Sequence, residues 1–428
     1  MPHAPPRLFS LSLYAVLTGA VAGTLVLAFR WVVETGQGTF LPAGIVGNYE
    51  ALGPAYRLGL PLLAGLVLGG LFHALPTDLR GVGIVHVIDR LRFSRERDLP
   101  AANAAIQFVA GAVAIVGGHS VDREGPGVHV GAAAGNLLAR RAAPTAEEEV
   151  LTLTACGAAA AIAAAFNTPL AGTLFAVEVL LFRYSVPRFI PVAIAAVVAA
   201  LLSRTVYGHQ PAFAVPPVAL GSVWEAPWLA GLGVAAGVTA GLFSLASTAI
   251  RARTFQWSPL LAFPVAGLVT GAIALAFPQV MGISYDTLQA MLAADLAPLA
   301  LAGILVAKLL ATATAIGLRL PGGLIGPTLV MGGAVGTLVG LGAEAVSAAP
   351  AGGAGLYAMV GMVATMGAAL RAPLSALLAL LELTGNPNVL LPGLLAVATA
   401  ELAVVPVLGQ TSVFERLLTV QRKGVGSV

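Results

Sequence analysis

Long apolar segments recur along most of this chain, and they constrain its fold more than any other feature. A straight helix needs roughly 20 apolar residues to cross the hydrocarbon core of a bilayer, and about a dozen such windows lie between Leu8 and Gly409. Charged residues make up 10% of the chain, against roughly 25% in soluble domains, and the mean hydropathy is +0.92. The sequence therefore predicts an all-α integral membrane protein with many passes, and it argues against a water-soluble enzyme.

Several apolar windows are too long and too interrupted to be single straight helices. The interrupted windows are Leu151 to Phe182 around Pro169, Leu320 to Val346 around Pro321 and Pro327, and Leu356 to Leu383 around Pro373. Non-helical backbone at membrane depth is tolerated only where it lines a cavity or is buried in protein. We therefore expect broken and re-entrant helices, which are typical of transporters and channels.

Basic residues indicate which helix ends face the cytoplasm. They gather in three places: a loop with Arg90, Arg92, Arg95 and Arg97, the pair Arg251 and Arg253, and a C-terminal group of Arg416, Arg422 and Lys423. Basic loops stay on the cytoplasmic side of a membrane, so both termini are predicted to lie inside. The stretch from Thr205 to Ile250 has no Lys or Arg, and we interpret its Pro-rich segment, Pro211 to Pro227, as an external linker. The net charge of +3 is unremarkable for a membrane protein with basic inner loops, and we expect a multi-pass protein of the inner, or plasma, membrane of a cell.

Two halves of the chain carry the same pattern of small residues. The segment from Asp122 to Gly135 aligns with the segment from Gly323 to Gly336 through a Gly-Pro pair and two further glycines. At nearly the same offset, Gly157 to Glu178 aligns with Gly361 to Glu382. With an odd number of spans per half, this pattern predicts an inverted repeat. The predicted single transmembrane domain, 1–428, has a first repeat at about 8–208, a linker at about 209–227, a second repeat at about 228–410 and a cytoplasmic-side helix at about 411–428.

Three glycine-rich segments lie where apolar runs begin: Gly81 to Val85, Asp122 to Pro126, and Gly323 to Pro327. Glycine lets the backbone approach a ligand closely, and the free N–H groups of a helix start favour an anion. One such segment is weak evidence, but the half-helix starts of an inverted repeat converge near the midplane, where substrates bind. These segments therefore predict a site that holds an anion with partial charges, from which the anion can also leave.

The same segments resemble the CLC family of chloride channels and proton-coupled chloride exchangers, which is the voltage-gated chloride channel family. The similarity runs from Gly81 to about Leu418. It is most specific in Arg123–Pro126, in Cys156–Ala160 leading to Phe166–Gly172, in Pro321–Pro327, and in Arg371–Leu374 leading to Leu381–Thr384. The resemblance implies a fold of many tilted and broken helices, and a homodimer with one separate pore in each subunit. No segment after Lys423 is long enough for a regulatory domain, so the chain resembles the short, bacterial-type members without CBS domains.

Glu124 is the residue that the resemblance singles out for gating and for carrying protons. A carboxylate in a membrane segment is costly to bury and is usually functional. At a helix start its charged form would compete with the permeant anion. The alternative is a structural role, in which Glu124 caps its helix or forms an ion pair with Arg123. The resemblance therefore favours a chloride/proton exchanger that works through Glu124.

The resemblance places the anion site at the three glycine-rich helix starts and at one aromatic residue near the C-terminus. The matching positions are Val82, Gly83, Ile84, Arg123, Gly125, Gly323, Leu324, Ile325, Gly326 and Phe414. Family members usually carry a serine at the position of Val82 and a tyrosine at the position of Phe414. Both hydroxyl donors are therefore missing, and each hydrogen bond lost to a charged ligand costs about 1.5 to 3 kcal/mol.

These departures predict weaker chloride binding at the centre of the pathway, or a different anion preference. A fluoride-exporting branch of the family also lacks these hydroxyl groups, so fluoride is the alternative substrate. Thr411 or Ser412 could supply a hydroxyl group in place of the missing tyrosine.

Two further departures bear on proton coupling. Many exchangers have an internal proton-accepting glutamate at the position of Val179, and many channels lack it, so a passive chloride channel is an alternative. Glu178 is a candidate for the proton path, although its repeat mate Glu382 favours a structural role for both. Asp122 replaces the usual glycine before Arg123, where its charge would cap the helix or repel anions.

The sequence carries no pattern that indicates an enzyme, a metal site or a cofactor. The single cysteine, Cys156, permits neither an intramolecular disulfide nor a cysteine metal cluster. His86 and His129 lack the spacing of metal ligands, and His119-Ser120 has no evident third partner for hydrolytic chemistry. The expected partners are chloride or another small anion, protons, the lipid bilayer and a second copy of the chain, with no role for nucleic acid.

Overall fold

The computed structural model describes residues 5–94, 97–142, 147–181, 184–209, 213, 220–346, 352–409 and 411–425. Within these ranges every regular element is a helix, and one isolated β-bridge joins Asp122 to Gly323. Ten helices there are long and apolar enough to cross a membrane. Three shorter apolar helices, at Ala101–Val116, Pro169–Leu181 and Pro373–Thr384, are too short to cross a bilayer alone. The predicted all-α membrane fold with partial spans is confirmed.

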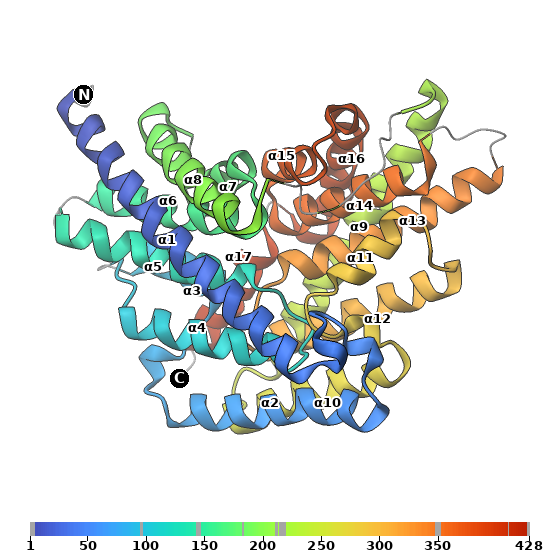
Figure 1. The fold of residues 1–428 in the computed structure, drawn as a ribbon, viewed down its shortest axis with the longest axis horizontal. Coiled ribbons are helices and arrows are strands. Elements are labelled where there is room, and N and C mark those ends of the chain that lie inside the picture. Colours follow the sequence, from blue (N-terminus) through green and yellow to red (C-terminus); the bar gives the residue numbers. More distant parts are fainter. Residues whose placement is uncertain are drawn as a thin grey trace.

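The described part of the first half folds into α1 (Pro5–Phe40), α2 (Pro54–Ala74), α3 (Gly83–Phe93), α4 (Ala101–Val116), α5 (Glu124–Ala142), α6 (Glu147–Phe166), α7 (Pro169–Phe175) and α8 (Val186–Tyr207). Short turns connect or extend them: η1 (Pro42–Gly44), η2 (Tyr49–Ala51), η3 (Thr77–Leu79) and the π-helical η4 (Ala176–Leu181). In Figure 1, α1 runs obliquely across one face of the molecule, and it packs against α5, α6 and α8. With 36 residues, α1 is longer than a straight crossing needs, which fits this tilt.

The described part of the second half folds into α9 (Ala226–Arg253), α10 (Pro259–Ala276), α11 (Tyr285–Leu292), α12 (Pro298–Gly317), α13 (Ile325–Val346), α14 (Gly353–Leu370), α15 (Pro373–Thr384), α16 (Leu390–Leu408) and α17 (Val413–Val425). Its short turns are η5 (Val223–Glu225), η6 (Pro278–Val280) and η7 (Pro387–Val389). α10 lies beside α2 of the first half along one edge of the molecule (Figure 1). Residues 210–212 and 214–219 of the predicted linker at 209–227 lie outside the described residues, as does Arg95, and α9 begins within the predicted linker range.

Two of the predicted helix breaks occur at equivalent places in the two halves. The chain turns between α6 and α7 at Asn167 and between α14 and α15 at Arg371, where φ is 59° and 57°. A proline, Pro169 or Pro373, then occupies the first position of the next helix, where an N–H group would have no intrahelical partner. The third predicted interruption is found at Pro321, which lies in the non-helical stretch between α12 and α13, but it is wrong at Pro327. α13 is continuous, because Pro327 lies in its first turn, where a missing N–H removes no helical hydrogen bond.

Small residues pack the helices of each half in the same way. In the first half α5 meets α6 where Gly131 lies against Gly157, and in the second half α13 meets α14 where Gly332 lies against Gly361. A Cβ atom on any of these four glycines would collide with a carbonyl oxygen of the facing helix. The equivalence of the two contacts supports the inverted repeat inferred from the aligned glycines.

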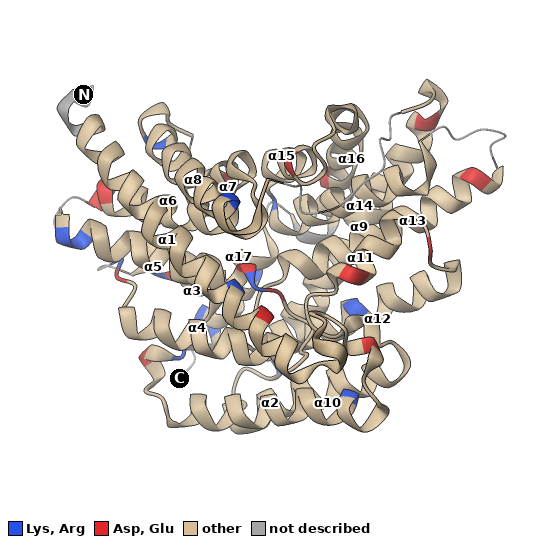
Figure 2. Ribbon diagram, in the orientation of Figure 1, with Lys and Arg blue, Asp and Glu red and all other residues tan. Residues whose placement is uncertain are grey.

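Charged side chains are rare along the helices. In Figure 2 they lie mostly near helix ends and around the centre of the molecule, close to α3, α11 and α17. Because a charge is costly in contact with hydrocarbon, the central group indicates a region that lipid does not reach. The two glycine-rich segments joined by the β-bridge meet in the interior, where both Asp122 and Gly323 are buried.

Candidate anion-binding site

The loops that precede α5 and α13 pair with each other. The Asp122 N–H donates to the Gly323 carbonyl oxygen (3.2 Å), and the Gly323 N–H donates to the Asp122 carbonyl oxygen (3.1 Å). These two residues also align with each other in the repeat. A Cβ on Gly125 would lie 2.5 Å from the Gly323 Cα, so only glycine permits this approach. The N-terminal ends of two long helices therefore converge.

The side chain of Asp122 caps both helices. Its Oδ1 accepts hydrogen bonds from the N–H groups of Glu124 (3.0 Å) and Gly125 (3.1 Å), and its Oδ2 accepts one from the Gly326 N–H (2.5 Å). The residue is completely buried. Helix starts carry unpaired N–H groups and a partial positive charge. The point where α5 and α13 meet therefore holds a carboxyl group in this structure.

The side chain of Glu124 is held by different partners. Its Oε1 accepts a hydrogen bond from the Tyr285 hydroxyl (3.1 Å) and lies 3.4 Å from the Nε of Arg123. Its Oε2 is buried and has no hydrogen-bond partner among the described residues. The ion pair with Arg123 is the structural contact considered above, whereas the helix cap is Asp122. Sequence reasoning missed Tyr285, because a tyrosine at the start of the short helix α11 gives no signal for a glutamate on α5.

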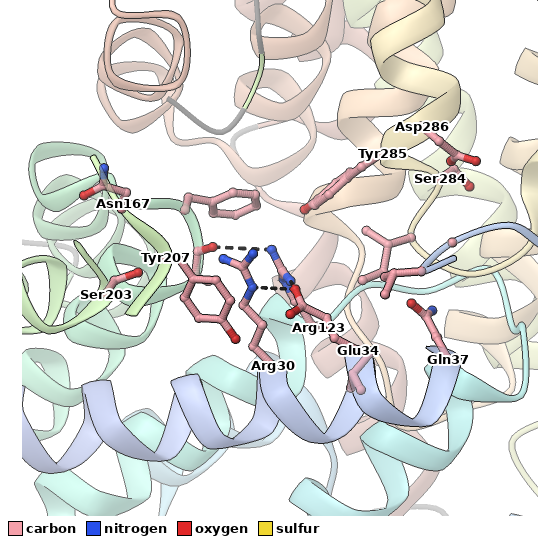
Figure 3. A pocket seen from close by; sticks show the side chains of 17 residues that line it. Arg30, Glu34, Gln37, Arg123, Asn167, Ser203, Tyr207, Ser284, Tyr285 and Asp286 are labelled. Atoms are coloured by element: carbon pink, nitrogen blue, oxygen red, sulfur yellow. Dashed lines mark hydrogen bonds and ion pairs between the residues drawn. The ribbon is translucent and has the colours of Figure 1, made fainter. Parts of the chain in front are cut away.

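A cavity of about 310 Å³, called the Arg123 cavity, lies beside Glu124. Its polar wall consists of Arg30, Glu34, Gln37, Arg123, Asn167, Ser203, Tyr207, Ser284, Tyr285 and Asp286. Figure 3 shows the side chains of Arg30 and Arg123 close to that of Glu34; the Oε1 of Glu34 is 2.6 Å from the Arg30 Nε and 3.5 Å from the Arg123 Nη1. Two arginines and two acidic residues line this cavity, so their formal charges balance.

A second cavity of about 480 Å³, called the Phe414 cavity, collects most of the predicted anion-binding residues. These are Val82, Gly83, Ile84, Gly125, Gly323, Leu324 and Phe414. Its wall also carries the charged residues Arg80, Arg90, Arg251, Arg319, Asp78 and Asp89. Four arginines against two aspartates leave an excess of positive charge, which raises the local concentration of anions.

Glu124 lies at the boundary between the two cavities. Its preceding neighbour, Arg123, lines the Arg123 cavity, and its following neighbour, Gly125, lines the Phe414 cavity. Of the other predicted anion-binding residues, Gly326 donates its N–H to Asp122, and Ile325 is 3% exposed and lines neither cavity. The short segment from Asp122 to Gly125 therefore separates the two cavities.

One predicted anion donor is already in use. The Gly83 N–H at the start of α3 donates to the Gln107 Oε1 (2.8 Å), a buried side chain of α4. Gln107 was not predicted, because the local sequence of α4 gives no signal that links it to α3.

The hydroxyl groups considered as substitutes for a tyrosine at Phe414 do not line the cavity. Ser412 Oγ accepts a hydrogen bond from the Glu415 N–H (3.3 Å), and the Ser412 N–H donates to the Glu415 carboxylate (3.0 Å). This is a capping box at the start of α17. Neither Ser412 nor Thr411 belongs to the wall of the Phe414 cavity, so neither replaces the missing tyrosine hydroxyl there.

Glu178 and its repeat mate Glu382 cap helices of opposite halves. The Glu178 carboxylate accepts hydrogen bonds from two N–H groups in the first turn of α15 (3.1 and 2.8 Å). The Glu382 carboxylate accepts two from the first turn of α7 (2.9 and 2.8 Å). Val179, which follows Glu178, is 2% exposed. The contacts of the two glutamates are thus reciprocal, as residues related by a two-fold axis would make.

Two of the histidines come together in the fold. The Nδ1 of His86 lies 3.4 Å from the Nε2 of His129, although the sequence separates them by 43 residues. Among the described residues, no group of three His, Cys, Asp or Glu side chains could hold a metal ion. The Ser120 hydroxyl is bonded to Thr312 (2.9 Å), and both ring nitrogens of the buried His119 lack a partner there. These contacts provide neither a metal geometry nor a catalytic one.

The membrane-length helices, the two cavities and the converging helix starts between them define a membrane transport protein. The sequence pattern of the voltage-gated chloride channel family matches residues 64–404. A ClcB-like protein of Ralstonia nicotianae is 33% identical over 419 residues, which are 95% of this chain and 96% of that relative. The chain belongs to the voltage-gated chloride channel family.

Solved structures share the whole fold. A slow cyanobacterial Cl⁻/H⁺ antiporter has a TM-score of 0.81 at 22% identity, over 97% of this chain and 99% of its own. A CLC-type fluoride/proton antiporter has a TM-score of 0.81 at 20% identity, with the same coverage of both chains. At these identities the similarity concerns the fold, and it confirms the predicted CLC-type architecture.

Proposed function

We propose that the protein moves a small inorganic anion, with chloride as the first candidate, across the plasma membrane. The observation that carries this proposal is the convergence of α5 and α13, whose first-turn N–H groups hold the Asp122 carboxyl group between the Arg123 and Phe414 cavities. Partial charges at helix starts bind an anion and also let it leave. In this proposal the anion passes from one cavity to the other at this point, and the protein is a transporter and not an enzyme.

We assign the Phe414 cavity to the cytoplasmic side of the membrane. Its wall includes Arg90 and Arg251, which belong to two of the basic groups in the sequence. Basic groups of this kind lie on the cytoplasmic side. The excess positive charge of the wall would draw anions into this cavity, and the Arg123 cavity would open to the outside.

Proton exchange through Glu124 is the coupling that fits this site best. Glu124 lies at the boundary of the two cavities, and its buried Oε2 has no partner among the described residues, so this oxygen can accept a proton. Loss of the charge would weaken the contact with Arg123 and would let the side chain move. Both oxygens of Glu178 already accept N–H bonds, so we assign Glu178 the structural role.

A passive chloride channel is the second candidate. Val179 stands where many exchangers carry an internal proton acceptor, and its side chain is buried. Fluoride is the alternative substrate, because Val82 and Phe414 give the wall of the Phe414 cavity methyl and phenyl groups where hydroxyl donors are usual. Both alternatives keep the same anion path.

The structure also favours a homodimer with one pore in each subunit. Leu170 at the start of α7 and Leu374 at the start of α15 are 49% and 55% exposed, and they lie beside the carboxylates of Glu382 and Glu178. Half-buried carboxylates are costly against lipid, and a second copy of the chain would cover them. Light scattering of the purified protein in detergent should give the mass of two chains, and a mass of one chain would contradict the dimer.

The proposal is tested by anion efflux from liposomes that contain the purified protein. Chloride, fluoride and nitrate are compared while proton uptake is recorded in the same vesicles. Stoichiometric proton movement identifies an exchanger, and anion flux without proton movement identifies a channel. If none of the three anions moves faster than in empty liposomes, the proposed function is wrong.

A further inference from the structure

The negative group at the meeting point of α5 and α13 is part of the chain itself. The carboxylate of Asp122 accepts N–H bonds from Glu124, Gly125 and Gly326, two in the first repeat and one in the second. A mobile anion bound between these helix starts would use the same N–H groups. We propose that Asp122 is a tethered anion that occupies the anion site and must leave it before a permeant anion can pass. This inference rests on the proposed anion transport.

The hydrogen bonds to the Asp122 carboxylate come from helix ends and not from a cation. In the described part of the chain Asp122 takes part in no ion pair. Lys308, a buried cation of α12, donates instead to the carbonyl oxygens of Val280 (3.0 Å) and Gly282 (3.1 Å) and to the Ser284 hydroxyl (2.7 Å). The carboxylate is therefore held as a small anion would be held, by N–H groups that can accept a replacement.

The second repeat leaves room for this carboxylate. Gly323 faces Asp122, and a Cβ on Gly323 would overlap the Asp122 Oδ1. The two residues occupy the same position in the aligned repeats, where one carries an acid and the other carries no side chain. The space between the helix starts therefore holds one carboxylate, which belongs to the first repeat.

Glu124 does not take this place. Its Oε1 is bonded to the Tyr285 hydroxyl and lies near the Arg123 guanidinium, and both partners line the Arg123 cavity. Movement of the Glu124 side chain would free none of the three N–H groups that Asp122 uses. Withdrawal of Asp122 would free all three together. The group that closes the anion site is thus distinct from the group proposed to carry the proton.

Chloride binding to the purified protein, measured by isothermal titration calorimetry, tests the proposal. Asp122→Ala removes the competing carboxylate, and Asp122→Asn keeps its shape but removes its charge. Both variants should bind chloride at least about tenfold more tightly than the wild type, because a group on a short tether competes at a high effective concentration. Asp295→Asn removes the same charge from an exposed residue outside both cavities, and its chloride affinity should equal that of the wild type.

Asp122→Ala also removes a helix cap and so lowers the stability of the protein. A second measurement therefore compares unfolding temperatures with and without chloride. Chloride should raise the unfolding temperature of Asp122→Ala, because a ligand that binds only the folded state stabilises it. The unfolding temperature of the wild type should respond much less. Equal chloride affinity in all four proteins, or an equal response of the unfolding temperature to chloride, would overturn the role of Asp122. Absence of anion flux in wild-type liposomes would instead overturn the proposed function, so the two failures can be told apart.

Discussion

The two glycine-rich helix starts share a backbone and differ in their side chains. The first repeat carries Asp122-Arg-Glu-Gly125 and the second carries Gly323-Leu-Ile-Gly326. Each segment precedes a long helix, and the two pair with each other through Asp122 and Gly323. Backbone symmetry brings two sets of N–H groups to one point, but both acidic side chains come from one repeat. The repeat thus builds the site, and its asymmetry supplies the charges that act there.

The capping glutamates give the opposite case. Glu178 and Glu382 are the same residue type at equivalent positions, and each caps a helix of the other half. Identical side chains across the pseudo-two-fold axis make reciprocal contacts that hold the halves together. Where the repeats keep the same residue the contact is structural, and where they differ we propose function. The predictions below test this distinction.

The largest effect is expected from Gly323→Ala, which makes the second helix start more like the first. The added Cβ would overlap the Asp122 Oδ1, and overpacking of a rigid site costs about 1–3 kcal/mol of the free energy of unfolding, apart from the displaced cap. We expect a marked fall in the unfolding temperature, measured by size-exclusion chromatography after heating. Gly342→Ala in α13, the helix that follows Gly323, is the control, because a Cβ there meets no atom within 4 Å.

The double variant Asp122→Gly with Gly323→Ala sharpens this test. It removes the carboxylate that the new methyl group would meet, so it should recover part of the lost stability. If Gly323→Ala unfolds at the same temperature as Gly342→Ala, the crowded contact does not exist in solution.

Glu124→Ala should abolish proton movement while anion flux continues. The variant removes the carboxylate at the boundary of the two cavities, and its repeat mate Ile325 offers no group in its place. Flux of both species is measured in the same liposomes. Glu149→Gln, which changes an acidic residue in the first turn of α6 outside both cavities, should keep both fluxes. Proton uptake that persists in Glu124→Ala would assign the proton to another residue.

Val82→Ser and Phe414→Tyr should each tighten chloride binding by about tenfold or more. Each variant adds a hydroxyl donor to the wall of the Phe414 cavity, and a hydrogen bond to a charged ligand contributes about 1.5 kcal/mol or more. Calorimetry measures the affinity. Phe255→Tyr adds the same hydroxyl group elsewhere on this wall and should change the affinity less. An equal gain in chloride affinity in all three variants would contradict the assignment of Val82 and Phe414 to the anion site.

The smallest effect is expected from the two capping glutamates. Glu178→Gln and Glu382→Gln each place an amide NH2 group opposite a helix N–H group. Loss of a helix cap costs about 1 kcal/mol of the free energy of unfolding. Their unfolding temperatures should fall by similar amounts, and proton flux should remain in both. Loss of proton flux in Glu178→Gln alone would break the symmetry and place Glu178 on the proton path.

Much of the site could be located from local patterns. The turns before Pro169 and Pro373 follow from prolines that cannot continue a helix, and Val82, Gly83 and Phe414 do line one cavity. The interruption expected around Pro327 did not occur, because a proline in a first turn has no helical bond to break. Position within the helix, which local composition does not reveal, made the difference.

The missed contacts share one property, which is that each joins residues of different elements. Tyr285 bonds to Glu124 across 161 positions of sequence, and Asp122 reaches the Gly326 N–H across 204. The Gly83 N–H is taken by the side chain of Gln107 on the next helix. No spacing rule within one segment predicts such pairs.

Membrane class, helix breaks and the repeat followed from the chain alone, because apolar length, proline and glycine act on neighbouring residues. The occupant of the site depended on packing. Asp122 and Glu124 are both acids beside one helix start, and the sequence favoured Glu124. Their places were set by the second repeat, since Gly323 leaves space for one carboxylate and Tyr285 offers a hydroxyl to the other. Electrostatic and steric complementarity between distant segments exists only once the two halves have come together.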